Sequence, residues 1–208
     1  MSEARNVADA VRELIERMVA TQAPPEVFHG VADDLRAVAA RLAEYPQGPL
    51  YFGYAEAANA DTVAGPFDNS PLLGKANPLA PPLHLAVEGD RVRGTATFGS
   101  AYEGPPGCVH GGFVAAAFDE LLGLAQTIGG NPGMTGRLIV HYRTPTPLRT
   151  ELRLEGWIER VDGRKTICHG TIHAGDRLCA ESEGLFVAVD RTKFEGLLAE
   201  REARRSAT

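Results

Sequence analysis

One stretch of the sequence reads as a helix that must be covered on almost every side. It runs GGFVAAAFDELLGLAQTIGG over residues 111–130. Pro105–Pro106 keep the preceding chain extended, and Gly129–Gly130 with Pro132 end the helix. Between these limits the residues are apolar almost all round the helix, and many are small. Such a helix is buried on most sides, as it would be when a sheet wraps around it.

Six strand-like segments flank this helix in the sequence. Residues 83–87 and 91–98 alternate between apolar and polar side chains, and the EGD between them predicts a tight hairpin. Four more candidate strands follow the helix, at residues 134–143, 151–160, 165–174 and 177–189. Their short junctions favour neighbouring antiparallel strands. The order predicts an α+β fold, in which a mainly antiparallel sheet wraps around one long central helix.

The rest of the chain is less regular. Two amphipathic patterns near the N-terminus, over Val7–Met18 and Val31–Leu42, predict a helical extension. A long stretch rich in proline, glycine and asparagine follows it, and such stretches are typical of lids and binding loops. A polar helix is expected after the last strand. The predicted parts are therefore an N-terminal helical extension, an irregular loop or lid, a strand-rich domain and a C-terminal helical tail, at residues 1–48, 49–82, 83–190 and 191–208.

Charge and composition argue against several classes of function. A nucleic-acid partner needs a basic surface, whereas the formal net charge here is −6. No apolar run approaches the roughly 18–20 residues of a membrane span, and we expect no secretory signal in the charged first residues. The three cysteines, Cys108, Cys168 and Cys179, include no CxxC pair. Reduced thiols and a cytoplasmic location are the expectation.

We expect neither a metal nor a cofactor. His169 and His173 are four residues apart, but four residues of a strand span about 13 Å, which is too far for one ion. The sequence contains no Gly-x-Gly-x-x-Gly or phosphate-loop pattern. Neither Cys108 nor any serine lies in a nucleophile-elbow sequence, which disfavours triad hydrolase chemistry.

Two carboxylates, Asp119 and Glu120, interrupt the apolar helix. Burying an unpaired carboxylate costs several kcal/mol or forces its protonation, so either residue is a candidate for a functional site. The alternative is an exposed position or an arginine partner, and this alternative is stronger for Glu120.

Helical geometry places one of these acids on the same face as the start of the helix. Gly112 and Asp119 are seven residues apart, so they lie about 10 Å apart along the axis. The N–H groups of Gly111 and Gly112 are free to stabilise an oxyanion. They are too far from Asp119 to act on one carbonyl, because reacting groups need contacts near 3 Å. A two-fold dimer with antiparallel helices would bring the glycines of one chain to Asp119 of the other.

Three stretches of the chain resemble one known family, the hotdog-fold acyl-CoA thioesterases of the phenylacetyl-CoA and animal thioesterase-superfamily type. The helix-opening motif of that family is similar to VHGGFVAAAFDELLG. Its following strand and its last two strands are similar to PGMTGRLIVHYRTPTPL (132–148) and VDGRKTICHGTIHAGDRLCAESEGLFVAV (161–189). The resemblance covers about residues 83–190 and leaves out the two N-terminal helices. It implies a hotdog fold for that part of the chain.

The resemblance also implies roles for particular residues. The family's His-Gly-Gly matches His110, Gly111 and Gly112, where a backbone amide polarises the thioester carbonyl and the histidine is expected to support the loop. The family's catalytic carboxylate matches Asp119, which would activate water as a base or attack as a nucleophile. A serine or threonine that helps to position water matches Thr135. Glu120 remains a rival to Asp119, because related enzymes use either acid.

Three further features of the sequence bear on this match. Some members carry an asparagine six residues before the histidine, where this chain has Gly104, and Glu103 is a candidate substitute. Arg164 and Lys165, on a hairpin turn, are candidates to meet coenzyme A phosphates. Strand alternation places Thr135 on the polar side of its strand, with Arg137, His141 and Arg143 and opposite Met134, Leu138, Val140 and Tyr142.

The sequence therefore predicts an acyl-CoA thioesterase that hydrolyses a fatty or aromatic acyl-CoA as a homodimer or homotetramer. Two alternatives stay open at this point. One is an enoyl-CoA hydratase or dehydratase on the same fold, and the other is a non-catalytic protein that binds acyl-CoA.

Overall fold

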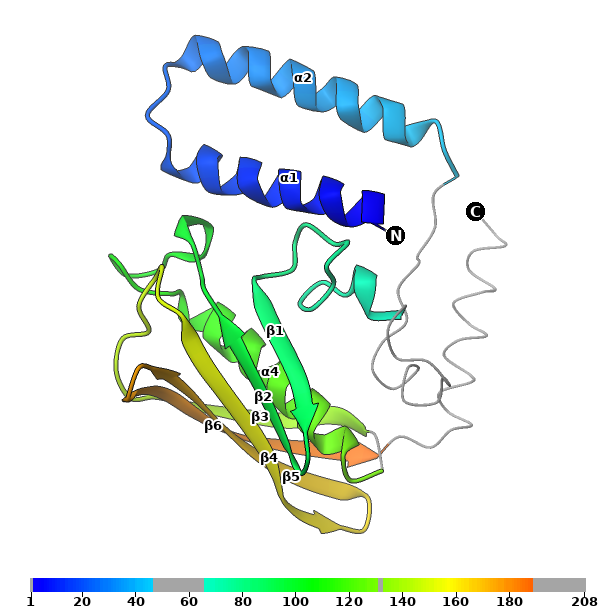
Figure 1. The fold of residues 1–208 in the computed structure, drawn as a ribbon, viewed down its shortest axis with the longest axis vertical. Coiled ribbons are helices and arrows are strands. Elements are labelled where there is room, and N and C mark those ends of the chain that lie inside the picture. The colour runs from blue at the N-terminus through cyan, green and yellow to red at the C-terminus, as the bar shows by residue number, and fades with distance from the viewer. Residues whose placement is uncertain (1, 47–65, 131–132, 189–208) are drawn as a thin grey trace.

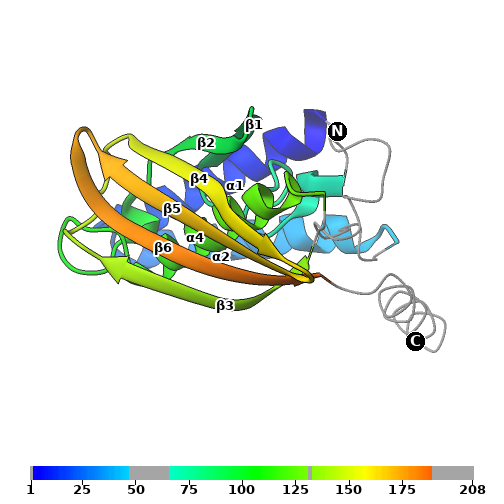
Figure 2. The same cartoon turned by 90° about the horizontal axis from the view of Figure 1, so that it is seen from below.

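A computed structural model describes residues 2–46, 66–130 and 133–188 of the chain. Six antiparallel strands form one sheet in the order β1-β2-β4-β5-β6-β3, and the sheet curves around the helix α4 (Figures 1 and 2). The helix contacts every strand of the sheet. The element bounds are β1 Leu83–Glu88, β2 Arg91–Ala96, α4 Gly111–Thr127, β3 Gly133–Tyr142, β4 Leu152–Asp162, β5 Lys165–Ala174 and β6 Arg177–Ala188. The predicted α+β architecture, its central helix and the order of elements along the chain are confirmed. The expectation that every short junction joins neighbouring strands was wrong for β3 and β4, because β3 pairs with β6 at the edge of the sheet.

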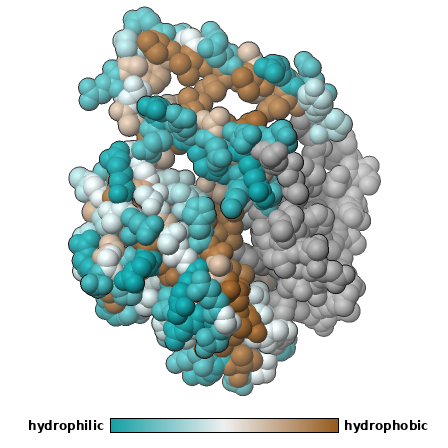
Figure 3. Space-filling view, viewed as in Figure 1, coloured by the Kyte–Doolittle hydropathy of each residue, from teal (hydrophilic) through white to brown (hydrophobic). Residues whose placement is uncertain are grey.

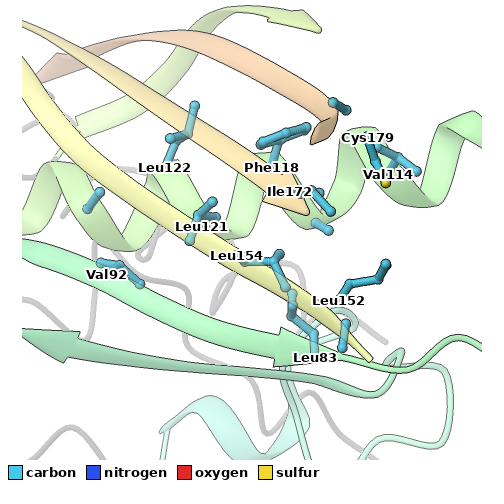
Figure 4. Close-up of a cluster of buried hydrophobic side chains, with 14 of the residues drawn as sticks. Leu83, Val92, Val114, Phe118, Leu121, Leu122, Leu152, Leu154, Ile172 and Cys179 are labelled. Carbon is cyan, nitrogen blue, oxygen red and sulfur yellow. The ribbon is translucent and has the colours of Figure 1, made fainter. Parts of the chain in front are cut away.

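The core lies between α4 and the concave face of the sheet. Phe118, Leu121 and Leu122 of α4 are fully buried and lie over the strands (Figure 4). Glycines on the strands beneath make this close approach possible. A Cβ at Gly156 would lie 2.9 Å from Leu121 Cγ, and one at Gly170 would lie 3.0 Å from both leucine side chains. The helix therefore rests directly on the sheet, because these strand positions carry no side chain.

A β-bulge interrupts the edge strand β3 near its start. The register with β6 shifts between Thr135 and Arg137, which leaves Gly136 as the extra residue. One inserted residue reverses the side to which the preceding side chain points. Thr135 is thus on the helix side of the sheet, opposite the buried Phe186, while Arg137 points outward. The prediction that Thr135 shares the polar side of the strand with Arg137 was wrong for this reason.

The predicted N-terminal extension consists of α1, Ser2–Ala20, and α2, Pro25–Ala43. Polar contacts hold α1 to the domain. Arg5 pairs with Asp68 at 2.7 Å, and Arg12 donates to four carbonyl oxygens of residues 74–80. Glu16 accepts the N–H groups of Ser100 and Ala101 at 3.0 and 3.2 Å.

The second helix, α2, has no buried residue. Apolar side chains gather along it and on the side turned toward α1 (Figure 3). The described part of the predicted loop or lid, residues 66–82, begins with the 3-10 turn η1, Pro66–Asn69, and is held against α1. Residues 49–65 of that loop and the predicted C-terminal tail, 191–208, lie outside the described residues.

None of the helices within the described ranges combines the length and the apolar character that crossing a membrane demands.

Candidate active site

The start of α4 presents one open backbone amide. His110 is the N-cap residue, and its Nδ1 accepts the N–H of Gly112 at 3.0 Å. The carbonyl oxygen of His110 accepts the N–H of Phe113 at 2.9 Å. The N–H of Gly111 has no acceptor among the residues that the structure describes. Only one of the two amides expected to bind an oxyanion is therefore open, because the histidine side chain caps the other.

This open amide lies beside an apolar pocket of about 420 Å³. Gly111 forms part of its wall, together with Pro105, Val109, Val114 and Pro145. Tyr142, Arg143, Thr144 and Thr146 add polar groups to this wall. A mainly apolar pocket with a few polar groups suits a ligand that has an apolar group next to a carbonyl.

Tyr142, which the sequence reasoning did not select, also reaches the start of the helix. Its hydroxyl donates to the carbonyl oxygen of Gly111 at 2.9 Å. Its ring lies 3.4 Å from where a Cβ on Gly111 would stand. No sequence signal singles out this tyrosine, because the contact joins residues 31 positions apart.

Asp119 and Thr135 form the second half of the candidate site. The Thr135 hydroxyl donates to Oδ1 of Asp119 at 2.8 Å, and the aspartate is half-buried. This hydrogen bond depends on the bulge at Gly136, which turns the threonine toward α4. Thr135 occupies one carboxylate oxygen and fixes the orientation of the group, so the other oxygen is available to water.

Glu120 lies on a different side of α4 from its neighbour. Only 9% of its surface is exposed, whereas Asp119 and Gly112 are both accessible. Successive helical residues point about 100° apart, so the two acids cannot share a face. Of the two alternatives given for Glu120, an exposed position is wrong, because the residue is buried. Asp119 is the acid that lies on the face of the helix start.

Backbone packing explains why this chain has glycine where some family members have asparagine. A Cβ on Gly104 would lie 2.7 Å from the Cα of His110. Glu103, the candidate substitute, uses its carboxylate to accept the N–H of Gly107 at 2.6 Å. Both residues thus shape the loop that leads to His110.

Arg164 and Lys165 lie at the hairpin between β4 and β5. Lys165 pairs with Val187 of β6, next to Phe186, the partner of Thr135. The two cations therefore lie toward the C-terminal end of α4, beyond Asp119. The guanidinium of Arg164 donates twice to the carbonyl oxygen of Ala188, at 2.9 and 3.3 Å, which holds it close to the end of β6.

No cluster of three or more metal-ligating side chains occurs in the part of the chain that the structure describes. His169 instead faces Glu159, with 3.0 Å between Nε2 and Oε2, and stacks on Trp157. The three cysteines are free, and burial raises the pKa of Cys168 to about 12, so that its thiol is a poor nucleophile.

Comparison with known proteins places this site in a family. Residues 106–181 match the family model of the thioesterase superfamily. A thioesterase superfamily protein of known crystal structure is 36% identical, with a TM-score of 0.78, over 88% of this chain and 94% of the other. The chain belongs to the thioesterase superfamily. The hotdog fold that the sequence resemblance implied is confirmed.

Curated relatives carry a more specific description. The acyl-coenzyme A thioesterase THEM4 of Xenopus laevis is 34% identical over 91 residues, which are 43% of this chain and 41% of the relative. The mouse protein of the same name is 32% identical over 93 residues, or 44% of this chain and 40% of the relative. The matched part thus spans about two fifths of the length of these thioesterases.

Proposed function

We propose that this protein is an acyl-CoA thioesterase in which each active site is shared by two protomers. The observation that carries the proposal is the arrangement on one face of α4. Gly112 and Asp119 share that face, the open Gly111 amide lies next to its start, and Asp119, oriented by Thr135, lies about two turns along it. An oxyanion donor and a general base are the two groups that thioester hydrolysis needs. Family membership and the named relatives agree with this chemistry.

A two-fold dimer would bring the two halves together. Within one chain, Gly111 and Asp119 are eight residues apart, which is about 12 Å along the helix. The strand β3 lies at the edge of the sheet, and its Met134 and Tyr142 are each 55% exposed. An open edge of this length is a ready site for pairing with another strand. Antiparallel pairing of two β3 edges would set the α4 helices side by side in opposite directions, with composite sites at each end. A tetramer made of two such dimers is compatible with this arrangement.

The chemistry in such a composite site needs no further group. The Gly111 N–H of one protomer binds the carbonyl oxygen of the thioester. The partner subunit's Asp119 takes a proton from water, and the water oxygen adds to the carbonyl carbon. The oxyanion collapses, the carbon–sulfur bond breaks, and the CoA thiolate receives the proton from Asp119. Direct attack by Asp119, with an anhydride intermediate that water later opens, is the alternative path.

We further propose where the parts of the substrate lie. The pocket beside Gly111 is mainly apolar and would hold a fatty or aromatic acyl group. Lys165 and Arg164, toward the C-terminal end of α4, would meet the phosphates of coenzyme A. Cys168 and Cys179 are buried and unpaired with each other, which supports a cytoplasmic location for the protein.

The test is thiol release from short-chain, long-chain and aromatic acyl-CoAs, with the wild type beside Asp119→Asn. The variant is expected to lose about 10²–10⁴-fold in kcat, because it lacks the base. Asp176→Asn is the matched control, since that aspartate lies on an exposed turn between β5 and β6. An inactive wild type that still binds acyl-CoA would refute the proposal in favour of a binding protein. Consumption of an enoyl-CoA without thiol release would instead indicate a hydratase.

A further inference from the structure

The peptide unit between Gly111 and Gly112 is held at both of its ends. Its carbonyl oxygen, on Gly111, accepts the Tyr142 hydroxyl at 2.9 Å. Its N–H, on Gly112, donates to Nδ1 of His110 at 3.0 Å. The open amide of Gly111 belongs to the preceding peptide unit. The φ and ψ angles of Gly111 set the orientation of that unit relative to the unit that Tyr142 and His110 hold. These two side-chain contacts are called the clamp below.

The direction of the Gly111 N–H depends on restraints from neighbouring residues. Glycine populates a wider range of φ and ψ than any other residue, so Gly111 does not fix its own backbone direction. Amides in the first turn of a helix also lack the hydrogen bonds that hold the later turns. Oxyanion stabilisation requires a donor that is already aimed before the reaction starts, because reorganisation would lower its contribution. The peptide unit that carries the Gly111 N–H is held on its carbonyl side, because the His110 oxygen accepts the N–H groups of Phe113 and Val114 at 2.9 and 3.3 Å. The two side-chain contacts add a second restraint, on the peptide unit that follows.

We propose that Tyr142 is a positioning residue for catalysis, which acts with His110 to aim the Gly111 amide at the substrate carbonyl. The inference rests on the proposed thioesterase function. Tyr142 does not touch the reacting atoms in this role. Its hydroxyl holds the carbonyl group of Gly111, and its ring lies 3.4 Å from the place where a Cβ on residue 111 would stand.

The decisive variant is Tyr142→Phe, which keeps the ring and removes only the hydroxyl. Loss of one hydrogen bond between neutral groups predicts a decrease in kcat of about 3- to 10-fold with little change in KM. Tyr102→Phe is the matched control, because the Tyr102 ring packs against Phe98 and Phe113, and the variant keeps the carbonyl oxygen that accepts the His110 N–H. Its kinetics are expected to equal those of the wild type.

Two inhibitors distinguish an effect on the orientation of the Gly111 amide from a general disturbance of the binding site. A trifluoromethyl ketone analogue of the acyl-CoA, which adds water to become tetrahedral, imitates the transition state, and a thioether analogue imitates only the shape of the substrate. Tyr142→Phe should weaken binding of the ketone by the same factor by which it lowers kcat. Binding of the thioether should be unchanged. A purely structural role would weaken both.

The histidine gives an independent test of the same clamp. Asparagine is also a good N-cap acceptor, so His110→Asn should retain most of the activity that His110→Ala loses. Combining His110→Ala with Tyr142→Phe should cause less than the product of the two separate losses, because both act on one peptide unit. An active wild type with a Tyr142→Phe variant of unchanged kcat and ketone affinity would overturn the inference alone. A wild type inactive on every thioester would overturn the proposed function first and this inference with it.

Discussion

Replacing Gly104 with alanine is expected to lower kcat by roughly 10- to 100-fold, although residue 104 touches no substrate. The new Cβ would lie 2.7 Å from the His110 Cα, and ordinary contact begins at 3.4 Å, so the two backbones must separate by about 0.7 Å. His110 caps α4 and precedes the Gly111 amide, so the displacement moves the proposed oxyanion donor. A misplacement of about 1 Å can reduce a rate by a hundredfold. Overpacking of this kind should also reduce the free energy of unfolding by about 1–3 kcal/mol.

The assay is steady-state thiol release together with urea denaturation of the same preparations. Gly30→Ala on α2 is the control, because a Cβ there meets nothing within 4 Å and alanine favours a helix. That variant should keep full activity and gain slightly in stability. If Gly104→Ala retains wild-type kcat while losing stability, the link between this packing contact and the aim of the Gly111 amide is refuted.

Further predictions concern the hydrogen bond between Thr135 and Asp119 and the contact of α1 with the domain. Thr135→Val should lower kcat about tenfold, because Asp119 loses the hydroxyl that orients it. Thr135→Ser keeps a hydroxyl and should have a kcat near that of the wild type. Equal rates for the two variants would contradict this role. The backbone N–H of Ser100, with further help from Ala101 and Arg149, lowers the pKa of Glu16 below its usual value of 4.5. The folded-state pKa is thus below the unfolded one, so Glu16 stabilises the fold above about pH 4.5, and this contribution disappears as the pH falls through the lowered pKa. Glu16→Gln should show a smaller loss of Tm between pH 6 and 3 than the wild type, and parallel curves would argue against the assignment.

The layout of the fold was predictable because it depends on local periodicity. The almost wholly apolar stretch after Gly111 required a cover, and the alternating segments on either side of it supplied a sheet. Helix spacing was equally informative about Asp119, since seven residues return to the same face. These signals come from neighbours in the sequence, and they need no knowledge of which strands pair.

The parts of the site that were missed depend on single residues or on distant contacts. Counting alternate residues along β3 gave the wrong side for Thr135, since Gly136 adds one residue that alternation cannot reveal. The hydrogen bond between Tyr142 and Gly111 joins the far end of β3 to the start of α4, so only the assembled fold shows it. The capping of Gly112 by His110 was open to inference from the N-cap position, but the amide was instead assumed to be free.

The glycines beneath α4 also restrict how substrate preference can change. With Gly156 and Gly170 under Leu121, helix and sheet touch, and there is no room between them for an acyl chain. Substrates must therefore lie along the outer side of the helix, where neighbouring protomers would meet. Chain-length preference should accordingly vary through the residues that line the pocket beside Gly111, while the contact between helix and sheet stays unchanged. Relatives with the same core could then differ widely in the acyl groups that they accept.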